Sequence, residues 1–153
     1  MKFLSSFLLF FIFLFAIPAK GQDLPAKNKA IIAFAESKKG KKVGKGECWD
    51  LAKAALDGAS AVWTPPYGFG KELDLKKDTV LAGDIIQLEK VKIVNPDKSW
   101  QDIPHHTAII YKVIAPGDYM VAEQNVDGKH SVVFAEMNLN FIKKGKYSIF
   151  RPQ

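Results

Sequence analysis

The chain has 153 residues, of which 48% are hydrophobic and 25% are charged, and its formal net charge at pH 7 is +6. This length suggests a single folded domain. A modest positive charge favours anionic surfaces such as a bacterial cell wall. It does not indicate nucleic acid, because the lysines at 39, 41, 42 and 45 are spaced by glycine and have no interleaved aromatic residues. We therefore predict no nucleic-acid partner.

The first 21 residues have the pattern of a secretory signal peptide. Residues 1–2 carry a positive charge, residues 3–17 are nearly all apolar, and Ala19 and Gly21 are the small residues that signal peptidase prefers. A membrane anchor is the alternative, but an apolar run of about 15 residues is shorter than the roughly 20 of a spanning helix. We expect cleavage after Gly21, contact with a membrane only during export, and a secreted (periplasmic or extracellular) chain of residues 22–153.

Two helices are predicted at the start of the remaining chain. Residues 30–35 begin an apolar helical stretch that should end near residue 40, and a loop rich in glycine and lysine then extends to Glu47. From Cys48 to Leu56, apolar residues recur at spacings of three and four, which is typical of the buried face of a helix. Gly58 lies where this second helix can end.

Short strands follow the helices. Segments rich in isoleucine, valine and aromatic residues alternate with Gly/Asp turns, which favours an antiparallel sheet. The polar residues 95–104 are expected to form an irregular loop. Because the helices precede the strands, we predict an α+β fold. The expected strands are residues 85–89, 91–94, 106–113, 119–124, 132–134 and 147–151.

Cys48 is the only cysteine in the chain. Cysteines of exported proteins usually pair, so Cys48 is half of an intermolecular disulfide, a buried apolar thiol, or a reactive thiol. Its place at a predicted helix start favours the reactive thiol, because the field there stabilises a thiolate. Gly44 and Gly46 permit a sharp approach of the backbone to this point. Backbone N–H groups at the helix start could also hold an oxyanion.

His106 is the candidate base for this thiol. A thiol nucleophile needs a base that is itself oriented by a third polar group. If the strands at 106–113 and 119–124 pair through the turn at Pro116, their far ends meet and His106 faces Glu123 and Asn125, which share one face of their strand. His105 is the alternative base, but alternation places it on the opposite face.

Four segments, in order, resemble the cysteine, histidine-dependent amidohydrolase/peptidase (CHAP) family. These are residues 46–51 (GECWDL), 82–86 (AGDII), 106–110 (HTAII) and 123–125 (EQN). The resemblance covers most of residues 30–151. It implies a papain-like, NlpC/P60-like fold with N-terminal helices, in which the helix that begins at the cysteine packs on a small antiparallel sheet or half-barrel. Residues 22–153 would then be one CHAP-like catalytic domain.

The resemblance also implies a mechanism and a substrate class. Cys48 would be the nucleophile, His106 the general acid/base, Glu123 the group that orients the imidazole, and Asn125 its assistant. The expected substrate is peptidoglycan, cleaved at the muramoyl–alanine amide or within the stem or cross-bridge peptides. The alternatives are a peptidase or acyltransferase of the same fold acting on another amide or peptide substrate, and a non-catalytic binding module. An immunity or inhibitor protein stays open as a partner.

Some residues depart from the family pattern or have a second interpretation. Ala82 replaces a usual proline, Trp49 is bulkier than usual, and no glutamine before Cys48 supplies the second oxyanion donor. The charge of Glu47 would raise the pKa of Cys48. The aromatic residues Trp63, Tyr67 and Trp100 are candidates to line a substrate groove, although Trp63 and Tyr67 could equally cap the core. No cofactor is predicted, and the spacing of the histidines and the cysteine predicts no metal site.

Overall fold

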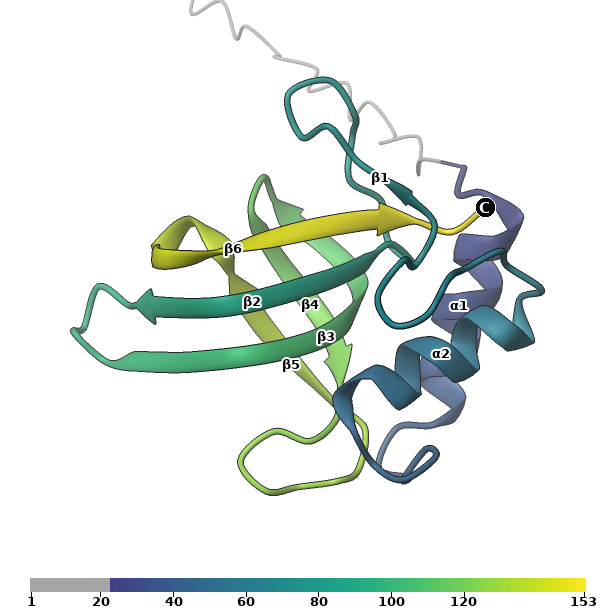
Figure 1. Ribbon diagram of the computed structural model, residues 1–153, viewed down its shortest axis with the longest axis horizontal. Helices are drawn as coiled ribbons and strands as arrows, with labels where there is room; N and C mark the ends of the chain where they lie inside the picture. The colour runs from purple at the N-terminus through teal and green to yellow at the C-terminus, as the bar shows by residue number, and fades with distance from the viewer. Residues whose placement is uncertain (1–22) are drawn as a thin grey trace, which may run out of the picture.

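A computed structural model describes residues 23–153 as two helices packed against a curved six-stranded sheet (Figure 1). The predicted signal peptide and its cleavage site lie outside the described residues. Within residues 23–153, no helix is long and apolar enough to cross a membrane. The elements are α1 (Ala26–Ser37), α2 (Cys48–Gly58), β1 (Lys71–Glu72), β2 (Ile85–Val94), β3 (Trp100–Ala115), β4 (Asp118–Glu123), β5 (Val133–Asn138), the 3-10 helix η1 (Leu139–Phe141) and β6 (Ile142–Arg151).

The sheet is antiparallel throughout, with the strand order β1-β6-β2-β3-β4-β5. Both helices lie on one side of it (Figure 1). The predicted α+β class is therefore confirmed. The predicted strands are present, and β1 is an additional two-residue strand that pairs with the end of β6.

The second helix has the predicted bounds, whereas α1 begins earlier than predicted. The first turn of α1 contains Asn28, which is fully buried. Its side chain is polar at a position where an amphipathic helix would have an apolar residue. The Asn28 amide donates to the carbonyl oxygen of Ala82 (2.8 Å) and to Asp84 Oδ1 (2.9 Å). A buried amide nitrogen that is paired in this way can replace an apolar contact, so hydrophobic periodicity alone missed this turn.

The polar segment before His105 forms part of a strand and is not the expected loop. Residues 100–103 pair with the end of β2, from Val94 opposite Trp100 to Val91 opposite Ile103. The two segments predicted as separate strands at 85–94 are likewise one strand, interrupted by a register shift near Lys90, where φ is +51°. The outer part of β3, residues 100–105, is largely exposed, so it lacks the apolar alternation by which strands are predicted.

Hydrophobic residues pack on both faces of the sheet. Ile85, Ile109 and Ala122 contact the helices, in a core that includes Ile31 and Leu51. A second core lies on the opposite face, inside the curve of the sheet, and includes Tyr119 and Leu139. The sheet residues in it are the sequence neighbours of those in the first core: Ile86, Ala108, Ile110 and Val121. Along this part of β3, Thr107 and Ile109 therefore face the helices, and His106 shares the inner face with Ala108 and Ile110.

We expect loss of the Arg151 guanidinium to destabilise the fold. Asp84 is fully buried and bonds to Arg151 through two contacts, at 3.0 and 2.7 Å. Removing one partner of a buried pair leaves an uncompensated charge. Arg151→Met should therefore lower the free energy of unfolding by about 3 kcal/mol, measured by urea denaturation. Lys53→Met, which breaks an exposed pair with Asp57, should cost less than about 0.5 kcal/mol. Equal losses from the two variants would contradict this prediction.

Candidate active site

Cys48 is the first residue of α2, and its approach loop, residues 43–47, is held by hydrogen bonds. The carboxylate of Asp50, in the first turn of α2, accepts hydrogen bonds from the backbone N–H of Lys45 (2.7 Å) and of Glu47 (3.1 Å). Gly46 has a φ of +93°, and a Cβ atom there would lie 2.8 Å from the Cβ of His130. Glycine at this position therefore lets the loop pass close to its neighbour on the way to Cys48.

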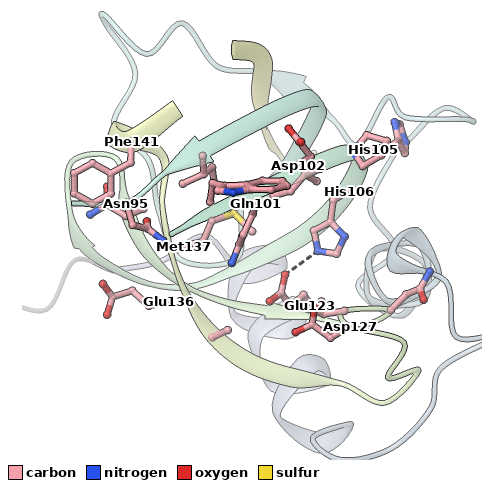
Figure 2. Close-up of a pocket in the computed structure, with 18 residues that line it drawn as sticks. Asn95, Gln101, Asp102, His105, His106, Glu123, Asp127, Glu136, Met137 and Phe141 are labelled. Carbon is pink, nitrogen blue, oxygen red and sulfur yellow. Dashed lines mark hydrogen bonds and ion pairs between the residues drawn. The ribbon is translucent and has the colours of Figure 1, made fainter. Parts of the chain in front are cut away.

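His106, within β3, and Glu123, the last residue of β4, form a buried pair. Their side chains point toward one another (Figure 2), with 2.7 Å between His106 Nε2 and Glu123 Oε2. The exposed fractions are only 10% for the His106 side chain and 7% for that of Glu123. With Nε2 engaged by Glu123, Nδ1 is the ring nitrogen left to exchange a proton with Cys48.

The register of the sheet explains how Cys48 reaches His106. The strands β3 and β4 pair from Ala115 back to Ile109, and residues 100–108 of β3 have no partner in β4. The start of α2 packs against β3 at this open edge, where the backbone N–H groups of Thr107 and Trp49 lower the pKa of Cys48. The geometry therefore brings Cys48, His106 and Glu123 together.

The pKa values of Cys48 and His106 shift in opposite directions. Burial alone would raise the pKa of Cys48, but hydrogen bonding to His106 and to backbone N–H groups outweighs burial and lowers it. Burial alone would lower the pKa of His106, but Cys48 and Glu123 outweigh it and raise this pKa to about 9. The favoured form is therefore a thiolate beside an imidazolium, which is the reactive form of a cysteine nucleophile.

The raised pKa of His106 predicts a dependence of stability on pH. A group whose pKa is higher in the folded state stabilises the fold fully below its ordinary pKa, here 6.5, and loses that contribution as the pH rises through about 9. The lowered pKa of Cys48 contributes with the opposite sign over the same range, so the contribution of His106 is isolated by removing the thiol. The free energy of unfolding of Cys48→Ala should then fall relative to that of Cys48→Ala/His106→Asn as the pH rises above about 7. Urea denaturation at a series of pH values measures this difference, and parallel curves for the two proteins would contradict it.

Asn125 lies near the site, but its side-chain hydrogen bond is to Glu47 and not to His106. Extending the β3–β4 register would place Asn125 opposite His106, as expected from the sequence. However, β4 ends at Glu123, and Asn125 has a φ of +62°, which turns its side chain away. Its amide donates to Glu47 Oε2 (2.9 Å). This contact also occupies the carboxylate of Glu47, whose charge we expected to oppose ionisation of Cys48.

Gln124 is the residue of this site that the sequence reasoning missed. Its side chain is fully buried and bonds to both ends of the loop that leads to Cys48. The signal was the alternation along β4, which points residue 124 toward the helices while Glu123 points inward. A glutamine on a core-facing position requires buried polar partners.

The three aromatic residues proposed to line a groove have different surroundings. The indole N–H of Trp63 donates to Asp57 Oδ1 (2.8 Å), and Trp63 and Tyr67 both pack against the core beneath the helices. Tyr67 also contacts the ring of His105, with 4.3 Å between centroids. Trp100, with 60% of its surface exposed, lies in the outer part of β3, where Lys92 Nζ is 4.8 Å from its ring centroid.

A cavity of about 750 Å³ adjoins His106 and Glu123 on the inner side of the sheet (Figure 2). Among the three aromatic candidates, only Trp100 lines it. Asp102 and Met137 also line it, so the cavity offers both polar and apolar contacts. Within residues 23–153, no group of histidine, cysteine and carboxylate side chains is arranged to hold a metal ion.

Comparison with known protein families identifies the family to which this fold belongs. A model of the family described as the AIM3/BBC1 cysteine proteinase-fold domain matches residues 28–153. The chain belongs to this family. The match extends from α1 to the end of the chain, so it includes Cys48, His106 and Glu123. It supports the cysteine-proteinase-like fold that the CHAP resemblance implied, without specifying CHAP or the NlpC/P60 arrangement.

A curated relative and two solved structures are similar to this AIM3/BBC1 domain. Altered inheritance of mitochondria protein 3 from Debaryomyces hansenii is 30% identical over 146 residues, covering 80% of this chain and 15% of its own length. The crystal structure of Ly7917 has a TM-score of 0.52 and 16% identity, over 82% of this chain and 62% of that one. A second structure, of Ly7917 with the hydrolyzing product of MDP, has a TM-score of 0.51 at the same identity and coverage. At this identity the likeness to Ly7917 shows the fold alone.

Proposed function

We propose that this domain is a thiol hydrolase that cleaves amide bonds through an acyl-enzyme on Cys48. The observation that supports it most directly is the buried contact between His106 and Glu123 beside a cysteine whose pKa is lowered. A cysteine that only fills space in a core needs neither a charged imidazole next to it nor a carboxylate behind that imidazole. The family and the fold agree with this chemistry.

Each residue has a defined part in the proposed reaction. The Cys48 thiolate attacks the carbonyl carbon, and the C–N bond breaks as His106 delivers its Nδ1 proton to the leaving amine. Water then attacks the thioester, gives a proton back to His106, and releases the carboxylic acid and the Cys48 thiolate. Glu123 keeps the imidazole oriented and stabilises its positive charge in both steps.

For the substrate, we propose peptidoglycan, cleaved at the muramoyl–alanine amide or within the peptides. The CHAP resemblance of the four sequence segments supports this choice, as does the modest positive charge. The structure of Ly7917 with the hydrolyzing product of MDP supports hydrolysis on a related fold. Export after cleavage near Gly21 would bring the domain to such a substrate, and it belongs to the same proposal.

A binding role without catalysis is the second candidate. It is favoured by the relative from Debaryomyces hansenii, whose name refers to mitochondrial inheritance and not to an enzyme, and this chain spans only 15% of that protein. In that case the domain serves as a binding surface for a partner, and Cys48 reacts no faster than an ordinary thiol.

A digest of two substrates tests the proposal. Residues 22–153 and a Cys48→Ala variant are incubated under reducing conditions with peptidoglycan sacculi and, separately, with a mixed peptide library, and new termini are identified by mass spectrometry. Stem-peptide termini from the wild type alone would support peptidoglycan as the substrate. Cleavage of the library alone would keep the thiol hydrolase and replace its substrate. No cleavage of either substrate, together with ordinary reactivity of Cys48 toward iodoacetamide, would favour the binding role.

A further inference from the structure

The loop before Cys48 is attached to the sheet by one buried side chain. Gln124 Nε2 donates to the carbonyl oxygens of Val43 (3.0 Å) and Glu47 (2.7 Å), and Gln124 Oε1 accepts from the backbone N–H of Val43 (3.2 Å). These three bonds hold the first and last residues of the loop. Since Cys48 follows Glu47 directly, the loop determines where α2 begins.

Two further contacts attach the same loop to the chain that follows β4. The Asn125 amide donates to Glu47 Oε2, and the His130 ring lies 3.1 Å from the carbonyl oxygen of Gly46 through Nδ1. The Asn125 contact is exposed and the His130 contact is partly buried, whereas both contacts between Gln124 and Val43 are buried. The loop contains Gly44 and Gly46, both with positive φ, so its own backbone restricts its shape little.

The residue before Gln124 is Glu123, which holds His106. The three consecutive residues 123–125 therefore bond to both halves of the site. Glu123 fixes the imidazole on the inner face of the sheet, while Gln124 and Asn125 fix the loop that carries the nucleophile. The distance between the Cys48 sulfur and the His106 ring depends on how firmly these two parts are joined.

We propose that Gln124 is a positioning residue that sets the separation of the Cys48 thiol from the His106 imidazole. The catalytic consequence rests on the proposed hydrolase function, whereas the effect on the thiol does not. A glutamine suits this position because it offers both donors and an acceptor. Glutamate could not donate to the two carbonyl oxygens. Methionine would leave the Val43 N–H without its partner and would remove one of the two hydrogen bonds that each carbonyl oxygen accepts.

The test is the pH dependence of Cys48 alkylation by iodoacetamide in the wild type and in Gln124→Met. A thiolate held beside an imidazolium reacts below the pH at which an ordinary thiol ionises. In Gln124→Met this reactivity at low pH should be lost, and the apparent pKa of Cys48 should move up toward its ordinary value. With an active substrate, kcat should fall about 10-fold or more with KM little changed, because misplaced reacting groups lose rate.

The control is Asn28→Leu, which removes another fully buried amide with two hydrogen bonds, in the first turn of α1. It matches the loss of a buried polar group without touching the loop. The proposal is overturned if folded Gln124→Met keeps the wild-type alkylation profile, or if Asn28→Leu shifts that profile as far.

A second pair of variants decides the question if Gln124→Met does not fold. Glu47→Gln is compared with Glu47→Gln/Asn125→Ala, so that the charge at position 47 is the same in both proteins. The double variant should show an upward shift of the apparent pKa of Cys48 that is smaller than the shift expected for Gln124→Met, and identical alkylation profiles would overturn the proposal.

The alkylation experiment requires no substrate, so it separates the positioning role from the hydrolase function. If the substitutions shift the apparent pKa of Cys48 but the wild type cleaves no substrate, the positioning role is kept and the hydrolase function is rejected. If the wild type is an active hydrolase but the substitutions leave alkylation unchanged, the hydrolase function is kept and the positioning role is rejected.

Discussion

Replacing Cys48 by serine or alanine is expected to abolish amide hydrolysis, with a loss in kcat of about 10⁴-fold or more. The proposed mechanism needs a thiolate at the start of α2, and a serine hydroxyl in the same place has a pKa too high to ionise beside His106. The measurement is the rate of release of new amine termini from the substrate found in the digest. Residual activity at a tenth of the wild-type rate would exclude covalent catalysis by Cys48.

The fold of the Cys48 variants must be compared with the wild type before the loss is interpreted. Cys48 is half-buried, and serine differs from cysteine by one atom, so circular dichroism and the midpoint of thermal unfolding should change little. The pKa of His106 should also fall in these variants, because the thiolate contributes to raising it. Titration of the His106 ring by NMR measures this change and requires no substrate.

Replacing His106 by asparagine is expected to lower kcat/KM by about 10³-fold or more, since the general base and the positive partner of the thiolate are removed together. The thiol should return to ordinary behaviour, so its alkylation near neutral pH should slow. The two readouts are independent, because alkylation reports the state of Cys48 and turnover reports proton transfer to the leaving amine.

His105 provides the matched control for this prediction. It is the adjacent residue, carries the same ring and lies on the other face of β3, where it bonds to Gln87 Nε2 and contacts Tyr67. His105→Asn should keep kcat/KM within a few-fold of the wild type. A large loss from His105→Asn with little loss from His106→Asn would reverse the assignment of the base.

The parts of the structure that the sequence predicted are those with strong local patterns. The apolar spacing after Cys48 and the glycine at its end predicted the bounds of α2. The alternation of β3 and the turn at Pro116 predicted that Glu123 would face His106. These features depend on periodicity and on turn chemistry, both of which are properties of short segments.

The parts that the sequence missed depend on contacts between distant residues. The side chain of Asn28 looks like a surface residue until Asp84 and the carbonyl of Ala82 are placed beside it. Gln124 looks like a strand-end residue until the loop at 43–47 is folded onto it, 81 positions away for Val43. Asn125 was placed by extending a strand that ends two residues earlier, at a backbone angle that periodicity does not predict.

The two cores on opposite faces of the sheet have a consequence for unfolding. The strands β2 and β3 contribute alternate side chains to each core, so detaching the helices would uncover Ile85 and Ile109 while the same strands still hold the inner core. Elements that share strands in this way are expected to melt in one cooperative transition. The nucleophile belongs to the helical layer and the base to the sheet. The catalytic pair would therefore be lost in the same step as the fold, with no partly melted species that keeps an activated thiol.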